Sequence, residues 1–369
     1  MSNRGMHRRP TRSSSRWLFL LVALLIVAAV SIRLATDRGT SRVSQHGSPS
    51  PAWAARKVAT SPSVSVSAAL PTPRTGGSSN PAKRGKLVLH GTGDVNVDPG
   101  YIPNFRSHGY AWAWSGLAGL FKRDDLTVIN LECAISDLGR AVPKTFNFRC
   151  DPAALPSMRK AGVEVANQGN NHAYDYGPSA VVDGRKNLLK NDIAAVGAGK
   201  NAKEALSPAL FEAKGWKIAV VGIDKVVDPW PTAVAGPDKP GTAAGHDQNA
   251  MVAAVRAASK QADIVIVAIH WGVELDTRPR ADDVQLGHLL IDAGADVIFG
   301  GHSHRLQPMG VYKGRPIFYS LGNFVWPRHS TAGATTAVAE VTVSPSGKFK
   351  GRMIPAFIEA SGHPVLRGS

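Results

Sequence analysis

The sequence alternates short apolar segments with longer segments of helical pattern, and the apolar segments lead into polar residues that can bind a metal or transfer a proton. Five such segments are KLVLH, LTVIN, GVEVAN, DIVIVAIH and DVIFGG. Helix-length patterns lie over residues 179–191, 248–261 and 282–294. Short β-favouring runs that alternate with helical patterns are typical of an α/β domain. We therefore expect an α/β fold.

Each of the five apolar segments is followed by at least one oxygen or imidazole donor. These donors are Asp94, Glu132, Asn171 with His172, His270, and His302 with His304. In open α/β sheets, functional groups collect beyond the carboxyl ends of the strands, so these donors are expected to meet there. A mixed set of Asp, Glu, Asn and His without thiolate suits Mn, Fe or Zn. The set predicts a metal site, although each residue alone is compatible with a turn, a cap or a surface position.

The segment GADVIFGGHSHRLQ, residues 294–307, is the most informative of these signals. It places two glycines after an apolar strand and then two histidines separated by one serine. In an extended backbone His302 and His304 would point to the same side, because side chains repeat every two residues. We therefore expect both imidazoles to face one site.

The N-terminal 85 residues differ in composition from the rest of the chain. They hold 13 of the 43 Lys and Arg residues and one of the 27 acids, so they carry most of the net charge of +16. Five arginines precede the apolar run WLFLLVALLIVAAVSI. We predict a basic cytoplasmic tail over 1–16 and a transmembrane signal anchor over 17–35, with the C-terminal bulk outside the cytoplasm. A cleaved signal peptide is the alternative, and it would make the protein secreted.

Residues 36–85 are rich in Ser, Pro, Thr, Ala and Gly. Such a segment buries too little apolar surface to fold, so we predict a disordered linker followed by a folded domain over residues 86–369. The remaining charge of the folded part is only about +4, and it lacks the basic, aromatic-interleaved pattern of nucleic-acid-binding domains. We expect no nucleic acid among its partners.

Seven motifs together resemble those of a known family. They are GDVNVD, NLECAI, FNFR, NNHAYDYG, HWGVE, GGHSH and SLGNF, and they are similar to motifs of the CapA family of poly-γ-glutamate capsule synthesis proteins, in the calcineurin-like metallophosphoesterase superfamily. The resemblance implies a sandwich of two mixed β-sheets flanked by helices. It also implies a surface role in making or exporting an anionic polymer, with membrane-bound capsule synthesis subunits as partners. Two alternatives remain: a secreted phosphatase or phosphodiesterase acting on nucleotides or envelope phosphates, and a binding module with a decayed site.

The resemblance further implies two divalent metal ions and a metal-dependent phosphoesterase type of site. One ion would be held by Asp94, Glu132 and His304, and the other by Glu132, Asn171, His270 and His302. Glu132 would bridge the two ions. Asn96 stands where the phosphoesterase pattern has a histidine, so an amide would replace a nitrogen ligand. This change would weaken binding of the ion held by Asp94, Glu132 and His304.

The same resemblance suggests the residues that act on substrate. His172 would protonate the leaving group. Asp175 would either tune His172 or cap the helix that follows it. Four residues lie in motifs that should border the cleft and bind substrate: Arg149, Lys144, Glu274 and Asn323. A surface ion pair is the alternative for Arg149, and a turn is the alternative for Asn323.

The chain contains two cysteines, Cys133 and Cys150, both expected outside the cytoplasm. A disulfide bond is the expected state in an oxidising compartment, with free thiols as the alternative. Closing a loop of this size would contribute about 3 kcal/mol by the chain-entropy estimate. The bond would tie the segment of Glu132 to that of Arg149.

Overall fold

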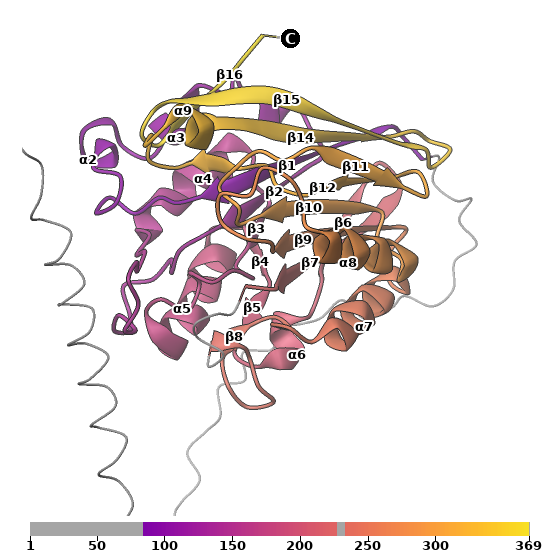
Figure 1. The fold of residues 1–369 in the computed structure, drawn as a ribbon, viewed down its shortest axis with the longest axis horizontal. Coiled ribbons are helices and arrows are strands. Elements are labelled where there is room, and N and C mark those ends of the chain that lie inside the picture. The colour runs from indigo at the N-terminus through magenta and orange to yellow at the C-terminus, as the bar shows by residue number, and fades with distance from the viewer. Residues whose placement is uncertain (1–83, 227–232, 369) are drawn as a thin grey trace, which may run out of the picture. The chain divides into compact units, whose positions relative to one another are not determined.

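The computed structural model describes residues 84–226 and 233–368, which form two mixed β-sheets packed face to face (Figure 1). The larger sheet contains β1 (Leu87–Val95), β2 (Leu126–Leu131), β3 (Val165–Asn167), β4 (Ala194–Val196), β13 (Asn323–Val325), β14 (Thr335–Val343), β15 (Phe349–Ala360) and β16 (His363–Leu366). Its strand order is β16-β15-β14-β1-β2-β3-β4, and β13 pairs with β1. The smaller sheet contains β6 (Ala209–Ala213), β7 (Trp216–Asp224), β9 (Ile264–His270), β10 (Val297–Gly301), β11 (Met309–Tyr312) and β12 (Arg315–Phe318), in the order β11-β12-β10-β9-β7-β6.

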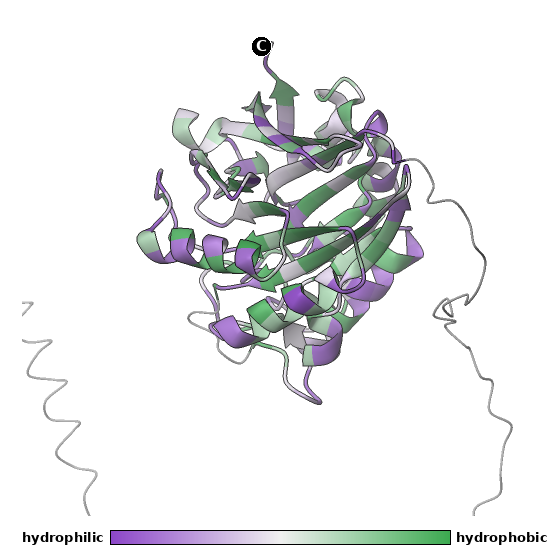
Figure 2. Ribbon diagram, turned by 90° about the vertical axis from the view of Figure 1, so that its right-hand side faces the viewer, coloured by the Kyte–Doolittle hydropathy of each residue, from purple (hydrophilic) through white to green (hydrophobic). Residues whose placement is uncertain are grey.

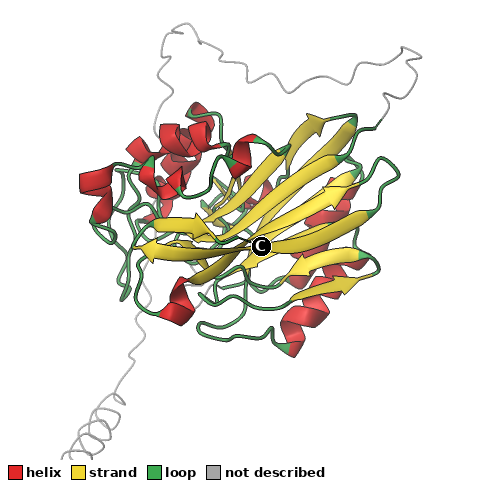
Figure 3. Ribbon diagram, turned by 90° about the horizontal axis from the view of Figure 1, so that it is seen from above, coloured by secondary structure: helices red, strands yellow, loops and turns green. Residues whose placement is uncertain are grey.

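Helices cover the outer faces of both sheets (Figure 3). The larger sheet is covered by α2 (Asn104–His108), α3 (Trp112–Ser115), α4 (Leu155–Ala161) and α5 (Gly177–Lys190), and the smaller sheet by α7 (Gln248–Ser259) and α8 (Ala281–Asp292). Short elements complete the fold: η1 (Leu120–Lys122), η2 (Pro152–Ala154), α6 (Ala202–Ala205), α9 (Thr331–Ala334), and the pair β5 (Ala198–Gly199) and β8 (Gly241–Thr242). The prediction of two mixed sheets flanked by helices is confirmed.

Successive side chains of a strand point to opposite faces of the sheet, and this alternation places them in two different cores. In β2, Leu126 and Val128 face the core between the sheets, whereas Ile129 and Leu131 face the core beneath the helices. Both faces of this strand are therefore apolar, as expected for strands covered on both sides. Figure 2 shows hydrophobic strands inside and hydrophilic residues on the outer sides of the helices.

The predicted tail, anchor and most of the predicted linker fall in residues 1–83, outside the described residues. Over 84–226 and 233–368, the structure has no helix with the length and apolar character needed to cross a membrane.

Parallel pairing brings the carboxyl ends of the central strands together. In the larger sheet Asp94 pairs with Asn130, and in the smaller sheet His270 pairs with Gly301. Glycine is required where the sheets meet: a Cβ at Gly91 would overlap the Phe299 ring, and a Cβ at Gly301 would overlap Asp94 Oδ1. The second glycine of GGHSH thus lets the histidine segment approach the end of β1.

Candidate metal centre

Four strands of the two sheets supply the central side chains of the candidate metal centre. Asp94 lies in β1, and Glu132 follows β2 directly. His270 is the last residue of β9, while His302 and His304 follow β10. Asp94, Glu132 and His270 have no exposed area. The donors that were predicted to converge from separate strand ends do lie together.

One group of candidate ligands consists of Glu132, His270 and His302, and we call it the histidine group. Its ligand atoms lie within 4.8 Å of one another. Glu132 Oε1 is 3.4 Å from His270 Nε2, and His302 Nδ1 is 3.1 Å from the same nitrogen. Asn171 Oδ1 is 2.9 Å from His270 Nε2 and adds a fourth donor.

The second group consists of Asp94, Glu132 and His304, and we call it the aspartate group. Its ligand atoms also lie within 4.8 Å of one another. His304 Nδ1 is 3.1 Å from Asp94 Oδ2, and His304 Nε2 is 3.8 Å from Glu132 Oε1. Glu132 belongs to both groups, which is the position that the family resemblance assigned to the bridging ligand.

The environment of Glu132 fits a ligand of a divalent cation. Its side chain is fully buried, and among the described residues neither carboxylate oxygen has a hydrogen-bond partner. A buried carboxylate without partners is costly unless it is paired or binds a metal. Burial, together with the charge of Asp94, raises the pKa of Glu132 well above its ordinary value. The surrounding imidazoles, carboxylates and amide oxygen suit Mn, Fe or Zn.

The two groups differ in the pKa values of their side chains. Burial lowers the pKa of His270 to about 4 and that of His302 well below its ordinary value. Burial also acts on His304, but the charge of Glu132 and the hydrogen bond and charge of Asp94 outweigh it and raise the pKa to about 9. Burial opposes ionisation of Asp94, yet His304 brings its pKa down to about 2. His270 and His302 are therefore neutral, whereas His304 and Asp94 form an ion pair.

His302 and His304 reach the site from a turn, so the expectation of an extended backbone is wrong. β10 ends at Gly301, and the two histidines have positive φ angles of 93° and 53°. Such backbone conformations cost a non-glycine residue about 1–3 kcal/mol and cluster at functional sites. The backbone N–H of His302 lies 3.3 Å from both Asp94 oxygens, which anchors the turn to β1.

Asn96 is buried near Asp94, but its side chain is used by the following loop. Its Oδ1 accepts the Asp98 N–H at 2.8 Å, and its Nδ2 has no hydrogen-bond partner within the part of the chain that the structure describes. Asn130 contacts the site instead. Its Nδ2 donates to Asp94 Oδ1 at 2.8 Å and lies 3.1 Å from His270 Nδ1. The sequence contained a signal for Asn130, which stands two residues before Glu132 at the end of the same strand.

His172 lies beside the metal centre and is held by Asp175. His172 Nδ1 is 2.6 Å from Asp175 Oδ2, and His172 Nε2 is 4.0 Å from Glu132 Oε1. Burial lowers the pKa of His172 to about 4, although Asp175 opposes this shift. Asp175 also accepts the Phe148 N–H at 2.7 Å. It does not cap α5, because the N-cap position is Tyr176 and no side chain caps this helix.

Lys144 is bound by the protein itself, in contrast to its expected role in gripping substrate. Its Nζ donates to Asp175 Oδ1 at 2.7 Å and to the carbonyl oxygen of Asn171 at 2.6 Å. The same nitrogen lies 3.2 Å from His172 Nδ1. These contacts hold the segment that carries Asn171 and His172.

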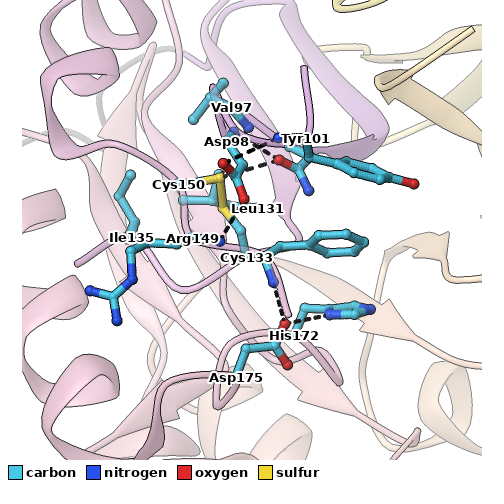
Figure 4. The surroundings of a disulfide bond; sticks show 12 residues. Val97, Asp98, Tyr101, Leu131, Cys133, Ile135, Arg149, Cys150, His172 and Asp175 are labelled. Atoms are coloured by element: carbon cyan, nitrogen blue, oxygen red, sulfur yellow. Dashed lines mark hydrogen bonds and ion pairs between the residues drawn. A yellow bond between two sulfur atoms is a disulfide. The ribbon is translucent and has the colours of Figure 1, made fainter. Parts of the chain in front are cut away.

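Arg149 likewise contacts the protein backbone rather than a cavity beside the centre. Its guanidinium donates to the carbonyl oxygens of Ser136 and Gly139, at 3.1 and 3.2 Å, and stacks on Tyr176 with its carbon 3.6 Å from the ring centroid. Figure 4 shows the guanidinium directed away from His172. The contacts of Arg149 therefore match neither the substrate-binding role nor the surface ion pair that the sequence suggested.

The predicted disulfide between Cys133 and Cys150 is present, with Cα atoms 5.7 Å apart (Figure 4). It connects the residue after Glu132 to the residue after Arg149. Val97 N–H donates to Cys150 Sγ at 3.0 Å. The disulfide ties the segment after β2 to that of Arg149, and the hydrogen bond from Val97 joins the segment after β1 to both.

Two cavities open beside the centre. The larger, about 510 Å³, borders the histidine group, and the smaller, about 280 Å³, borders His172 and His304. Glu274 lines both cavities, as expected for a residue at the cleft. Asn323 lines the smaller cavity, and its Oδ1 lies 2.8 Å from His304 Nδ1. Asn323 thus orients a candidate ligand.

The end of β7 also reaches this region, and it was not predicted from the sequence. Asp224 is fully buried, and burial raises its pKa to about 6. Lys225 lines the larger cavity, where its Nζ donates to Asp282 and Asp283 at 2.9 and 2.7 Å. The run WKIAVVGID before Lys225 has the same pattern as the five predicted strand ends.

The two mixed sheets with their flanking helices make this fold calcineurin-like, and the candidate ligands gather at its strand ends. A solved structure described as a novel phosphatase, from Mycoplasma pneumoniae, has a similar fold, with a TM-score of 0.50. The two share 15% identity, and the match covers 74% of this chain and 94% of that one. At this identity the likeness concerns the fold alone.

The chain belongs to the family described as bacterial capsule synthesis protein PGA_cap, which matches residues 88–328. The PGA biosynthesis protein CapA of Bacillus subtilis is 31% identical over 254 residues, covering 68% of this chain and 66% of that protein. The capsule biosynthesis protein CapA of Bacillus anthracis is 32% identical over 289 residues, covering 76% and 70%. A probable polyglutamine synthesis accessory protein of Mycobacterium tuberculosis is 30% identical over 230 residues, covering 58% and 60%. The family inferred from the motifs is confirmed.

Proposed function

We propose that this chain is a membrane-anchored, extracytoplasmic protein that assists the synthesis or export of a poly-γ-glutamate-type capsule or a related cell-envelope polymer. Membership of the capsule synthesis family supports the process, and two Bacillus relatives carry names of PGA or capsule biosynthesis. The basic and apolar pattern of residues 1–35 supports the anchor and the external position. Its partners are the anionic polymer and other membrane-bound subunits.

We further propose that the site holds two divalent cations, one in each ligand group. The observation that carries this proposal is the fully buried Glu132, which lacks hydrogen-bond partners among the described residues and belongs to both groups. Cations at such a site polarise phosphoryl oxygens and lower the pKa of water, which is the chemistry of a phosphoesterase.

His172 moves the proton at the leaving oxygen in this proposal. Asp175 accepts the Nδ1–H of His172 and fixes the orientation of its ring. The Nε2 atom, which faces Glu132, then delivers or accepts the proton. Lys144 binds Asp175 and so keeps the pair in place.

Metal analysis of the purified full-length protein tests the site. Equilibrium dialysis of the protein against excess Mn²⁺ is expected to show two bound equivalents. His270→Ala should hold one or fewer, because it removes the donor on which the histidine group converges. His288→Ala is the matched control, since this imidazole stacks on Tyr312 outside the site. A wild-type protein with less than one equivalent would contradict the proposal.

Polymer assays distinguish this function from the alternative of a secreted metal-dependent phosphatase or phosphodiesterase acting on nucleotides or envelope phosphates. The His172–Asp175 pair favours the alternative, because it is suited to proton transfer on a small substrate. In the capsule role, cells without this chain lose surface polymer, and the wild type but not Glu132→Ala restores it. In the alternative role, the polymer persists, and the purified protein hydrolyses model phosphoesters with Mn²⁺ until His172→Ala abolishes the activity.

A further inference from the structure

The smaller cavity beside the candidate metal centre has aromatic walls. Its volume is about 280 Å³, and it is lined by Tyr101, Phe146, Phe148 and Trp326 together with His172 and His304. Sites for drug-sized ligands occupy about 300–1,000 Å³. The cavity therefore fits one ring system rather than an extended piece of polymer.

The aromatic rings form a continuous series that ends at the metal centre. The Phe148 ring centroid lies 4.2 Å from that of His172 and 4.5 Å from that of Tyr101. The Trp326 centroid lies 4.8 Å from that of His304 and 5.5 Å from that of Phe148. Phe148 and Trp326 are buried, whereas Phe146, which also lines the cavity, is 59% exposed. A planar ring that enters past Phe146 meets aromatic surface directly beside the site.

The charged groups around the cavity do not match a chain of carboxylates. Arg305 lines the cavity, but its guanidinium donates to the His304 carbonyl oxygen at 2.7 Å. Among the described lining residues there is no lysine, the charge of His304 is paired with Asp94, and Glu274 adds a carboxylate. Repeated carboxylates are thus less suited to this lining than an uncharged ring, which has aromatic faces to stack on.

We propose that this cavity binds a planar aromatic ring carried by the leaving alcohol of a phosphoester. The inference rests on the proposed function, which assigns His172 to the leaving oxygen, and His172 lines the cavity. His172 Nε2 first takes up a proton from solvent, since Nδ1–H is held by Asp175. Water then attacks phosphorus and loses a proton to solvent, the bond from phosphorus to the alcohol oxygen breaks, and that oxygen takes the Nε2 proton. The alcohol then occupies the aromatic cavity while the phosphoryl group remains at the metal centre.

Two phosphonates test this inference by calorimetric binding to the full-length protein, with Mn²⁺ and without it. Benzylphosphonate and ethylphosphonate have the same charged group and resist hydrolysis, but only the first has a ring. We expect benzylphosphonate to bind about tenfold more tightly, because a stacked aromatic contact adds to the burial of apolar area. Because the charged group is the same in both, the ratio of the two affinities measures the contribution of the ring alone.

Variants of the lining residues show which side chains produce the preference for the ring. Phe146→Ala should reduce the ratio to about threefold or less, and its exposure makes a folding defect small. Tyr101→Leu should act in the same direction, because it removes a ring while it keeps most of the bulk. Leu189→Ala shortens a comparably exposed side chain, 51% exposed, on α5 and should leave the ratio unchanged.

The possible outcomes distinguish a failure of the ring site from a failure of the proposed function. Equal affinities in a protein that binds Mn²⁺ would overturn the ring site and leave the proposed function intact. A protein that binds no Mn²⁺ would overturn the proposed function, and the ratio measured without metal would still decide whether the cavity selects a ring. If neither phosphonate binds in either state, the ring site is wrong.

Discussion

The histidine group and the aspartate group share Glu132 but differ in how far the protein already uses their donors. In the histidine group, His302 Nδ1 and Asn171 Oδ1 lie 3.1 and 2.9 Å from His270 Nε2. These donor atoms converge on one place, and the rings of His270 and His302 are neutral because burial lowers their pKa values. Four donors are therefore ready to surround a cation.

The aspartate group has fewer donors, and two of them already form an ion pair. Asp94 is hydrogen-bonded by Asn130 and paired with His304 at 3.1 Å. Asn96 stands where a histidine would supply another nitrogen, but its oxygen accepts a backbone N–H. A cation has to replace the contact between Asp94 and His304 before it can bind. We expect the first cation to bind the histidine group tightly and the second to bind the aspartate group weakly.

Removing the shared carboxylate should have the largest effect on both groups. In Glu132→Gln, Mn²⁺ affinity should fall by about 100-fold or more, since even the outer partners of metal ligands contribute 10–100-fold. The Mn²⁺-induced rise in Tm should disappear. In EDTA the variant should instead be more stable than the wild type, by about 1 kcal/mol, because a buried carboxyl group without hydrogen-bond partners, costly whether ionised or protonated, is removed.

Calorimetric melting with Mn²⁺ and with EDTA measures both effects of Glu132→Gln. Glu359→Gln is the control, because Glu359 forms an exposed ion pair with Arg367 and should change Tm little. A Glu132→Gln protein that keeps the wild-type response to Mn²⁺ would show that the two groups do not depend on a shared ligand.

Single histidine replacements should separate the two groups. His270→Ala is expected to lose the tightly bound Mn²⁺, because His270 Nε2 contacts three other donors of its group. His304→Ala is expected to keep that ion and to lose only the weaker one. Isothermal titration resolves the two affinities. Identical titration curves for the two variants would contradict the difference between the groups.

The convergence of these donors could be predicted because it follows from strand periodicity and from the position of parallel strand ends. LTVIN and DIVIVAIH predicted β2 and β9, and Glu132 and His270 at their ends lie 3.4 Å apart. β7 has an equivalent run ending in Asp224 and was overlooked. Strands β14 and β15 were not predicted, since they follow the matched motifs and lead to no functional residue.

The roles of Lys144 and Arg149 could not be predicted, because they depend on the path of an irregular segment. Residues 132–151 have no strand or helix period, so the sequence does not show which groups the two cations meet. Lys144 meets Asp175, and Arg149 meets backbone carbonyls and Tyr176. Family motifs indicated only that both lie near the site.

Lys144→Met should affect catalysis while both metal groups remain occupied. If the protein hydrolyses phosphoesters, kcat should fall about tenfold, a part of the 10²–10⁴-fold that proton transfer contributes, with little change in KM. The reason is that Lys144 Nζ holds Asp175 and the carbonyl oxygen of Asn171. Lys144→Arg should recover part of the rate. A higher KM with unchanged kcat would instead show that Lys144 binds substrate.

Asn96→Ala should have the smallest effect on metal binding and thereby sharpen the contrast between the groups. Asn96 Oδ1 accepts the Asp98 N–H at 2.8 Å, so this side chain organises the loop after β1. Both Mn²⁺ affinities should stay within about twofold of wild type, whereas the free energy of unfolding should fall by about 1–2 kcal/mol in urea denaturation, because a buried hydrogen bond is lost. If the weaker affinity falls steeply while stability is unchanged, the Asn96 oxygen is a ligand, and the aspartate group has as many donors as the histidine group.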